Sequence, residues 1–300
     1  ILTAMAPAAG AAADIAQGVW SHQVRFIGAG AIGVSAIWTL IKLAVPLWTG
    51  IRAAIAAQRQ REAGGGAALA RTEQDIPIGV MAVISLICLV PIAVMLAVFL
   101  AGGPLSGLIV PLTIAALLYI VVAGFAVAAV CGYMAGLIGS SNSPVSGMAI
   151  LSVLGAALLI AAIGLPILKG GDAKPLIAFS LLVTSVLIAV AVSANDNLQD
   201  LKTGQLVDAT PWRQQVALLF GVVAGSAVIP VVLNLLNKAY GFAGANSHAI
   251  SATPLAAPQA TLISTIASGV ISHDLPWGLI GIGGLLGAGL VLVDELLRRT

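Results

Sequence analysis

The chain has 300 residues, of which 60% are hydrophobic and only 8% are charged, and its formal net charge is +2. A soluble domain carries about 25% charged residues, because water must solvate its surface. The 13 basic and 11 acidic side chains cannot cover a soluble protein of this size, so most of the surface is expected to face the lipid bilayer. Nucleic acid is not expected as a partner, since phosphate binding needs clustered Lys and Arg.

Seven stretches are apolar and long enough to cross a bilayer, which takes about 20 residues of helix. They are residues 26–47, 76–100, 105–128, 148–168, 176–194, 216–236 and 277–297. An eighth stretch, residues 260–271, is too short to span and is expected to be re-entrant or a half-helix. The sequence therefore predicts an all-α, polytopic transmembrane bundle with broken or re-entrant helices, forming one transmembrane unit over residues 1–300.

The segment between the first two spans, about residues 48–75, is expected to be a mobile cytoplasmic loop. The basic residues counted with it are Lys42, Arg52, Arg59, Arg61 and Arg71. Positive charge stays on the cytoplasmic side during insertion. Alternation of the spans then places Lys202, Arg213 and the Arg298–Arg299 pair on the same side, as in a multi-pass inner-membrane protein.

Glycines recur inside the first and last spans, and Gly28, Gly30 and Gly33 match the dinucleotide-binding pattern GxGxxG. That fingerprint needs a preceding strand, which is missing here. We interpret the glycines as points where helix backbones approach closely, because packing must hold a bundle together in lipid. No cofactor is expected.

The uncharged segment 139–147 separates two apolar runs, and Pro144 must break a helix there. Transporters use broken helices to bind substrates and ions, because the break frees backbone polar groups. The candidate substrate-binding residues of this segment are Ser140, Ser141, Asn142, Ser143 and Ser146. The alternative interpretation is a short polar turn at the membrane surface.

A second polar segment, residues 195–205, precedes the sixth span, which Thr210 and Pro211 are expected to open as N-cap and first residue. Asp200 and Lys202 are too close in sequence to share a helix face, and we expect them to act in gating through different partners. A plain cytoplasmic loop with an interfacial tryptophan is the alternative for this segment.

Two further amides are candidates for the substrate site. Gln259 follows two prolines at the start of the short segment, and Asn234 lies late in the sixth span. Asn in a membrane bundle more often joins helices than binds ligands. The histidines lack ligand spacing, so no metal site is expected, and no catalytic constellation supports an enzyme.

Several motifs resemble the oligopeptide transporter (OPT) superfamily, in family order along nearly the whole chain. The longest are GLIGSSNSPVSGM at residues 136–148, NLQDLKTG at 197–204 and ATPWRQQ at 209–215; shorter ones are RFIGAGAI at 25–32, WTLIK at 38–42, PQA at 258–260 and LPW at 275–277. The pattern is closer to the bacterial members and the Yellow Stripe-like metal-chelate branch. Family members are about twice this length, so the resemblance implies a fragment of about half a transporter.

The resemblance also implies secondary active uptake, coupled to protons, of small oligopeptides or metal-chelate, siderophore-like complexes. The function expected for the chain is therefore that of a membrane symporter segment. A membrane channel or a non-transporting scaffold subunit is the alternative. The oligomeric state is left open, and a homo-oligomer is compatible with the sequence.

Overall fold

The computed structural model describes residues 12–62, 70–168, 172–242 and 257–298, which are helical and contain no strand. The helices are α2 (Ala12–Val19), α3 (Arg25–Glu62), α4 (Ile78–Ala101), α5 (Ile109–Ile138), α6 (Val145–Leu168), α7 (Lys174–Leu206), α8 (Pro211–Tyr240), α9 (Pro258–Ile271) and α10 (Trp277–Leu297). Short turns of other helix types, η1 (Trp20–Val24), η2 (Arg71–Glu73) and η3 (Ser106–Leu108), precede α3, α4 and α5. Seven helices in this part of the chain are long and apolar enough to cross a membrane, which confirms the expected fold class of an all-α polytopic bundle.

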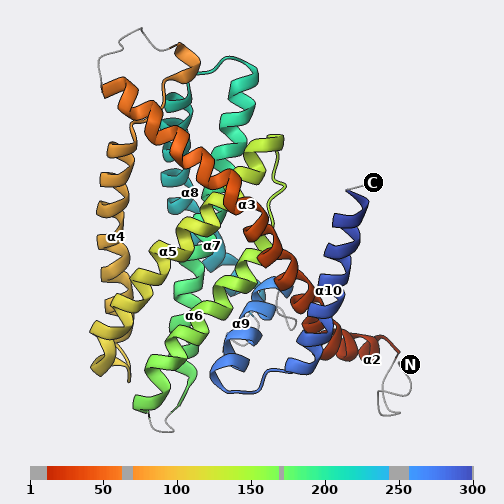
Figure 1. Cartoon of the computed structure of the whole chain (residues 1–300). Helices are drawn as coiled ribbons and strands as arrows, with labels where there is room; N and C mark the ends of the chain where they lie inside the picture. The colour runs from red at the N-terminus through yellow and green to blue at the C-terminus, as the bar shows by residue number, and fades with distance from the viewer. Residues whose placement is uncertain (1–11, 63–69, 169–171, 243–256, 299–300) are drawn as a thin grey trace.

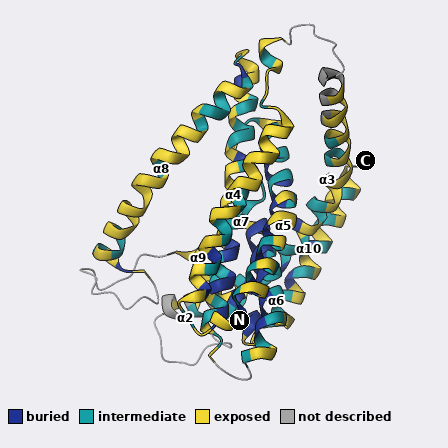
Figure 2. Ribbon diagram, turned by 90° about the vertical axis from the view of Figure 1, so that its left-hand side faces the viewer, coloured by how far each residue is buried: buried dark blue, intermediate teal, exposed yellow. Residues whose placement is uncertain are grey.

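The centre of the bundle is formed by α5, α6, α7 and α9 (Figure 2). Fully buried side chains such as Leu112, Val153, Phe179 and Ile271 pack here. Small residues bring α5 and α7 close together, since a Cβ added at Gly132 would lie 3.3 Å from the Leu198 side chain. Because lipid gives no hydrophobic drive to helix association, this close packing is what holds the membrane core together.

Helices α3 and α10 lie side by side at one edge of the bundle (Figure 1). A Cβ at Gly283 would overlap the carbonyl of Ile27, and one at Gly287 would come within 2.7 Å of the carbonyl oxygen of Ala31. Both contacts advance by four residues on each helix, so α3 and α10 run in the same direction. The interpretation of the glycines as close-approach points is confirmed for Gly30, Gly283 and Gly287, whereas a Cβ at Gly28 or Gly33 would meet nothing within 4 Å.

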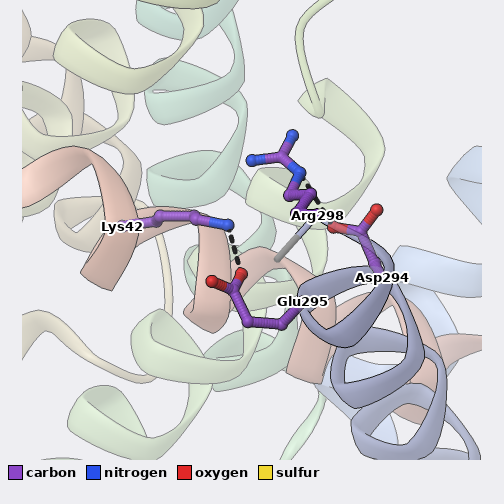
Figure 3. A network of polar contacts seen from close by, with 4 residues as sticks. All are labelled: Lys42, Asp294, Glu295 and Arg298. Atoms are coloured by element: carbon purple, nitrogen blue, oxygen red, sulfur yellow. Dashed lines mark hydrogen bonds and ion pairs between the residues drawn. The ribbon is translucent and has the colours of Figure 1, made fainter. Parts of the chain in front are cut away.

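An ion pair also joins α3 to α10, further along both helices (Figure 3). Lys42 Nζ lies 2.6 Å from Glu295 Oε2, and Arg298 Nε lies 3.4 Å from Asp294 Oδ2 within α10. Lys42 was counted with the loop basic residues in the sequence prediction. The structure corrects this, because Lys42 belongs to α3 and joins it to α10.

The expected loop over residues 48–75 is also corrected. Helix α3 continues to Glu62, because residues 51–62 consist mainly of Ala, Gln, Arg and Glu, which favour helix. The glycine triplet at residues 64–66 lies outside the described residues. Of the connection between α3 and α4, the structure describes residues 70–77, which include η2.

The polar segment 195–205 is helical and forms the last turns of α7, so the alternative of a plain loop is wrong. Polarity favoured a loop, yet the segment holds no proline and its one glycine, Gly204, lies only two residues before the end of α7. The chain turns immediately afterwards, where Asp208 adopts a positive φ of 56°. Thr210 and Pro211 do occupy the expected positions at the start of α8, although Thr210 makes no capping hydrogen bond.

Helix α8 packs against α7 near this turn and then diverges from the bundle (Figure 2). None of its residues is buried against the described part of the chain. Asn234 is therefore on an exposed helix, away from the packed centre.

Candidate functional site

The break between α5 and α6 is the central feature of the candidate site. Helix α5 ends at Gly139, whose φ of 76° is left-handed and therefore favours glycine. The Gly139 N–H still donates to the Ala135 carbonyl at 2.8 Å, which closes the last turn of α5. The chain then runs back alongside the bundle, so that α6 begins below the end of α5 (Figure 1). Pro144 precedes the first residue of α6, as the sequence predicted for a helix break.

Two serines of the break are hydrogen-bonded to α7. The Ser141 hydroxyl donates to Gln199 Oε1 at 2.7 Å, and the Ser143 hydroxyl donates to Asn195 Oδ1. The Asn195 amide nitrogen donates to Ser141 Oγ at 3.4 Å and to Asp196 Oδ1 at 3.2 Å. The break is thus held to α7 by neutral side chains, with one carboxylate at its margin.

Asn195 is the hub of this network and is only 4% exposed. A buried amide must satisfy both its donor and its acceptor, because each unpaired group costs free energy. Asn195 does so with partners from the break and from its own helix. The sequence analysis missed Asn195 and Gln199 as site residues. Because Asn195 and Gln199 are four positions apart, a helix places both on one face, and this spacing could have identified them as a pair of site residues.

Ser140, Ser141, Asn142 and Ser146 of the break are exposed, whereas Ser143 is half-buried and Gly147 is buried. The Asn142 backbone N–H donates to the Ser140 carbonyl at 2.7 Å, whereas its side-chain amide makes no hydrogen bond to the residues described. An exposed amide that can donate and accept is therefore presented between two bonded serines.

No hydrogen bond joins Gln259 or Asn234 to this break among the described residues. The carbonyl of Pro258, next to Gln259, accepts a hydrogen bond of 2.6 Å from Arg25 at the start of α3. Gly147, just after the break, packs instead against Ile32 and Ala36 of α3. At 1.5 Å per residue, these points on α3 are separated by roughly 10–16 Å. Asn234 is further removed, on the exposed face of α8.

Asp200 and Lys202 lie one to two turns beyond Asn195 on α7 and point to different neighbours. Asp200 lines a pocket of about 520 Å³ between α7 and α8, together with Gln214. Lys202 donates to Gln205 at 3.0 Å. A Cβ at Gly139 would lie 3.2 Å from its side chain, so Lys202 packs against the end of α5. The polar end of α7 therefore contacts the break on one side and α8 on the other.

No three His, Cys, Asp or Glu side chains converge as a metal site within the described ranges. The site thus consists of the turn between α5 and α6, an amide hub and a polar helix end in a multi-pass membrane protein. This combination defines a membrane protein in which a polar turn between two spanning helices packs against the polar end of a third.

Comparison with known proteins identifies the family. The family described as OPT oligopeptide transporter protein matches residues 4–300, and the chain belongs to this family. A curated protein of Haemophilus influenzae, named "Putative oligopeptide transporter", is 41% identical over 293 residues. That alignment covers 96% of this chain and 46% of the relative, so the chain spans about half the length of the protein that it matches. No solved structure matches the chain.

The family assignment confirms the resemblance found in the sequence and the expected relation to a protein about twice as long. It also agrees with the expectation of a transporter rather than an enzyme. The seven apolar helices make the chain a multi-pass membrane protein.

Proposed function

We propose that this chain forms part of the substrate path of a secondary active, proton-coupled uptake carrier. Its substrates are small oligopeptides or metal-chelate, siderophore-like complexes, and the membrane is the inner membrane of the cell. The observation that carries the proposal is the α5–α6 break, whose Ser141 and Ser143 are fixed to Asn195 and Gln199 of α7. Family membership supports transport as the activity of the whole protein.

The chemistry of the break fits a substrate whose charges are compensated. Residues 139–147 carry no formal charge. Ser140, Asn142 and Ser146 offer exposed donors and acceptors, and the hydroxyls of the exposed Ser141 and the half-buried Ser143 are hydrogen-bonded to α7. A zwitterionic peptide or a chelated metal would exchange water for these neutral groups without leaving a fixed charge unpaired at depth.

The end of α7 would serve as the gate on the cytoplasmic side. η2 and the α7–α8 turn lie at the same end of the bundle, where Arg71 donates to the Asp208 carbonyl (Figure 1). Arg52, Arg59 and Arg213 lie at this end, and the bias of basic residues supports a cytoplasmic location. Lys202 contacts the end of α5 and Asp200 faces α8, so a movement of α7 would be transmitted to both helices.

An uptake assay on the full-length protein with peptide and metal-chelate panels tests the proposal. Asn142→Ala is expected to abolish accumulation while leaving expression and insertion unchanged, and Asn142→Asp should fail as well, because a carboxylate lacks the donor and adds a charge. Asn234→Ala is the matched control, since it removes an exposed amide from a spanning helix away from the break.

A protonophore should abolish accumulation by the unmodified protein, which separates a coupled carrier from a channel. Near-normal uptake by Asn142→Ala would contradict the substrate role. The segment from Ser140 to Gly147 would then be a surface turn.

A further inference from the structure

A pocket with two arginines in its wall lies at the turn between α7 and α8 and is separate from the α5–α6 break. Its volume is about 460 Å³, and its wall includes Arg71, Asp208, Thr210 and Arg213. Arg71 comes from the connection before α4, whereas the other three come from the α7–α8 turn and the start of α8. Segments more than 130 positions apart in sequence therefore meet here, through a hydrogen bond of 2.9 Å from Arg71 Nη2 to the Asp208 carbonyl.

The pocket is at the boundary between water and hydrocarbon. The apolar stretch of α8 begins at Val216, less than one turn after Arg213, and that of α4 begins a few residues after Arg71. Trp212 is exposed beside the pocket, and tryptophan is enriched at the headgroup level of membranes. The two guanidinium groups thus sit at the depth where lipid phosphates lie.

Several donors in the pocket have no acceptor within the described part of the chain. The Arg213 guanidinium lies over the Trp212 ring, 5.4 Å from its centroid, and makes no hydrogen bond or ion pair there. The Thr210 hydroxyl makes no capping bond. Arg71 uses one nitrogen on the Asp208 carbonyl and keeps further N–H groups available.

The backbone at the start of α8 does not supply these donors. The Trp212 N–H donates to the Gln74 carbonyl at 3.2 Å, and the Arg213 N–H donates to the Thr210 carbonyl at 3.2 Å. Pro211 has no N–H. Recognition of an anion in this pocket therefore depends on the side chains of Arg71, Arg213 and Thr210.

The charge of the pocket matches one phosphodiester. Two guanidinium groups and the Asp208 carboxylate give a net charge of +1 among the charged residues of its wall. Arginine binds phosphate oxygens through paired N–H groups, and basic pockets between membrane helices bind lipid headgroups. We propose that the Arg71–Arg213 pocket binds the phosphodiester of an anionic phospholipid of the surrounding bilayer.

Native mass spectrometry of the purified full-length protein tests the proposal, with phosphatidylglycerol, phosphatidylcholine and inorganic phosphate as separate probes. The R71Q/R213Q variant is expected to bind phosphatidylglycerol at least about tenfold more weakly, since hydrogen bonds to charged groups are among the strongest in proteins. The control is R52Q/R59Q, which removes the same charge at the same end and also an arginine stacked on a tryptophan, because Arg52 lies 5.0 Å from the Trp48 ring centroid.

Two further measurements test whether the bound phosphate belongs to a lipid and whether the Asp208 carboxylate weakens binding. D208N is expected to strengthen phosphatidylglycerol binding severalfold, because it removes the one negative charge from the wall. Equal binding of phosphatidylglycerol by R71Q/R213Q and R52Q/R59Q would overturn the proposal. Displacement of the lipid by millimolar inorganic phosphate would overturn the lipid assignment and identify a free-anion site.

If the double variant does not fold, R213Q alone carries the test. Arg213 makes no polar contact with the described residues that the fold would lose. Unchanged phosphatidylglycerol binding by a folded R213Q protein would equally overturn the proposal.

Discussion

Helices α6 and α8 have the same hydropathy and opposite surroundings. The most apolar window of each has a mean hydropathy of 2.6, and each contains an internal proline, Pro166 in α6 and Pro230 in α8. Eleven residues of α6 are buried by neighbouring helices, whereas no residue of α8 is buried by the described chain. Hydropathy therefore identifies a membrane helix without telling what the helix faces, because hydrocarbon is as apolar as a protein core.

Shape distinguishes the two helices where hydropathy does not. A Cβ at Gly155 of α6 would overlap the Tyr119 hydroxyl, and one at Gly164 would overlap the Leu176 side chain. A Cβ at Gly221 of α8 would meet nothing within 4 Å. Neighbouring side chains thus fill the space beside Gly155 and Gly164 of α6, whereas the space beside Gly221 of α8 is open.

The largest effect on stability is expected when a bulky side chain replaces an enclosed glycine of α6. Gly164→Leu should destabilise the protein by about 3 kcal/mol, at the upper end for overpacking of a filled core, because Leu176 already occupies the space. Gly221→Leu should change the stability by less than about 0.5 kcal/mol, as for an exposed site. Thermal unfolding in detergent measures both.

A marked loss of stability in Gly221→Leu would contradict the conclusion that α8 is less enclosed than α6. It would show that α8 is covered by protein outside the described residues, and not by lipid.

A smaller loss of stability is expected when an asparagine of α7 or α8 is replaced by alanine. Asn195→Ala should cost about 1–2 kcal/mol, because Ser143 and Ser141 lose a hydrogen-bond partner in a part-buried network. Asn234→Ala should be close to neutral, since that amide is exposed. The free energies of unfolding of the two variants check this, and equal values would mean that the break does not depend on α7.

The smallest effect on stability is expected from the Lys42–Glu295 ion pair, which joins α3 to α10. Its side chains are 36% and 28% exposed, so a double-mutant cycle with Lys42→Gln and Glu295→Gln should give a coupling of at most about 1 kcal/mol. The coupling should fall at high salt because ions screen exposed charges. A coupling that is large and independent of salt would show that the pair is shielded from water.

The sequence predicts the spanning helices well, because an uninterrupted run of about twenty apolar residues is typical of a transmembrane helix. It also locates the interruption within residues 139–147, where α5 ends at Gly139 and Pro144 precedes α6. It fails at the end of α7, where charge and amides indicated a loop but Asn195 and Gln199 point inward from a helix. It also gives no sign that α6 is enclosed and α8 exposed, because that depends on neighbours distant in the sequence.

The parallel contact between α3 and α10 has a consequence for biosynthesis. Lys42 and Glu295 are 253 positions apart, and the helices between them must be inserted before the two can meet. At a synthesis rate of about 5–20 residues per second, α3 waits in the membrane for roughly 10–50 seconds before α10 emerges. During that time the surface around Gly30, where α10 will later dock, is open to lipid or to insertion factors. The docking surface of α3 for α10 must therefore be kept from binding elsewhere until α10 has been inserted.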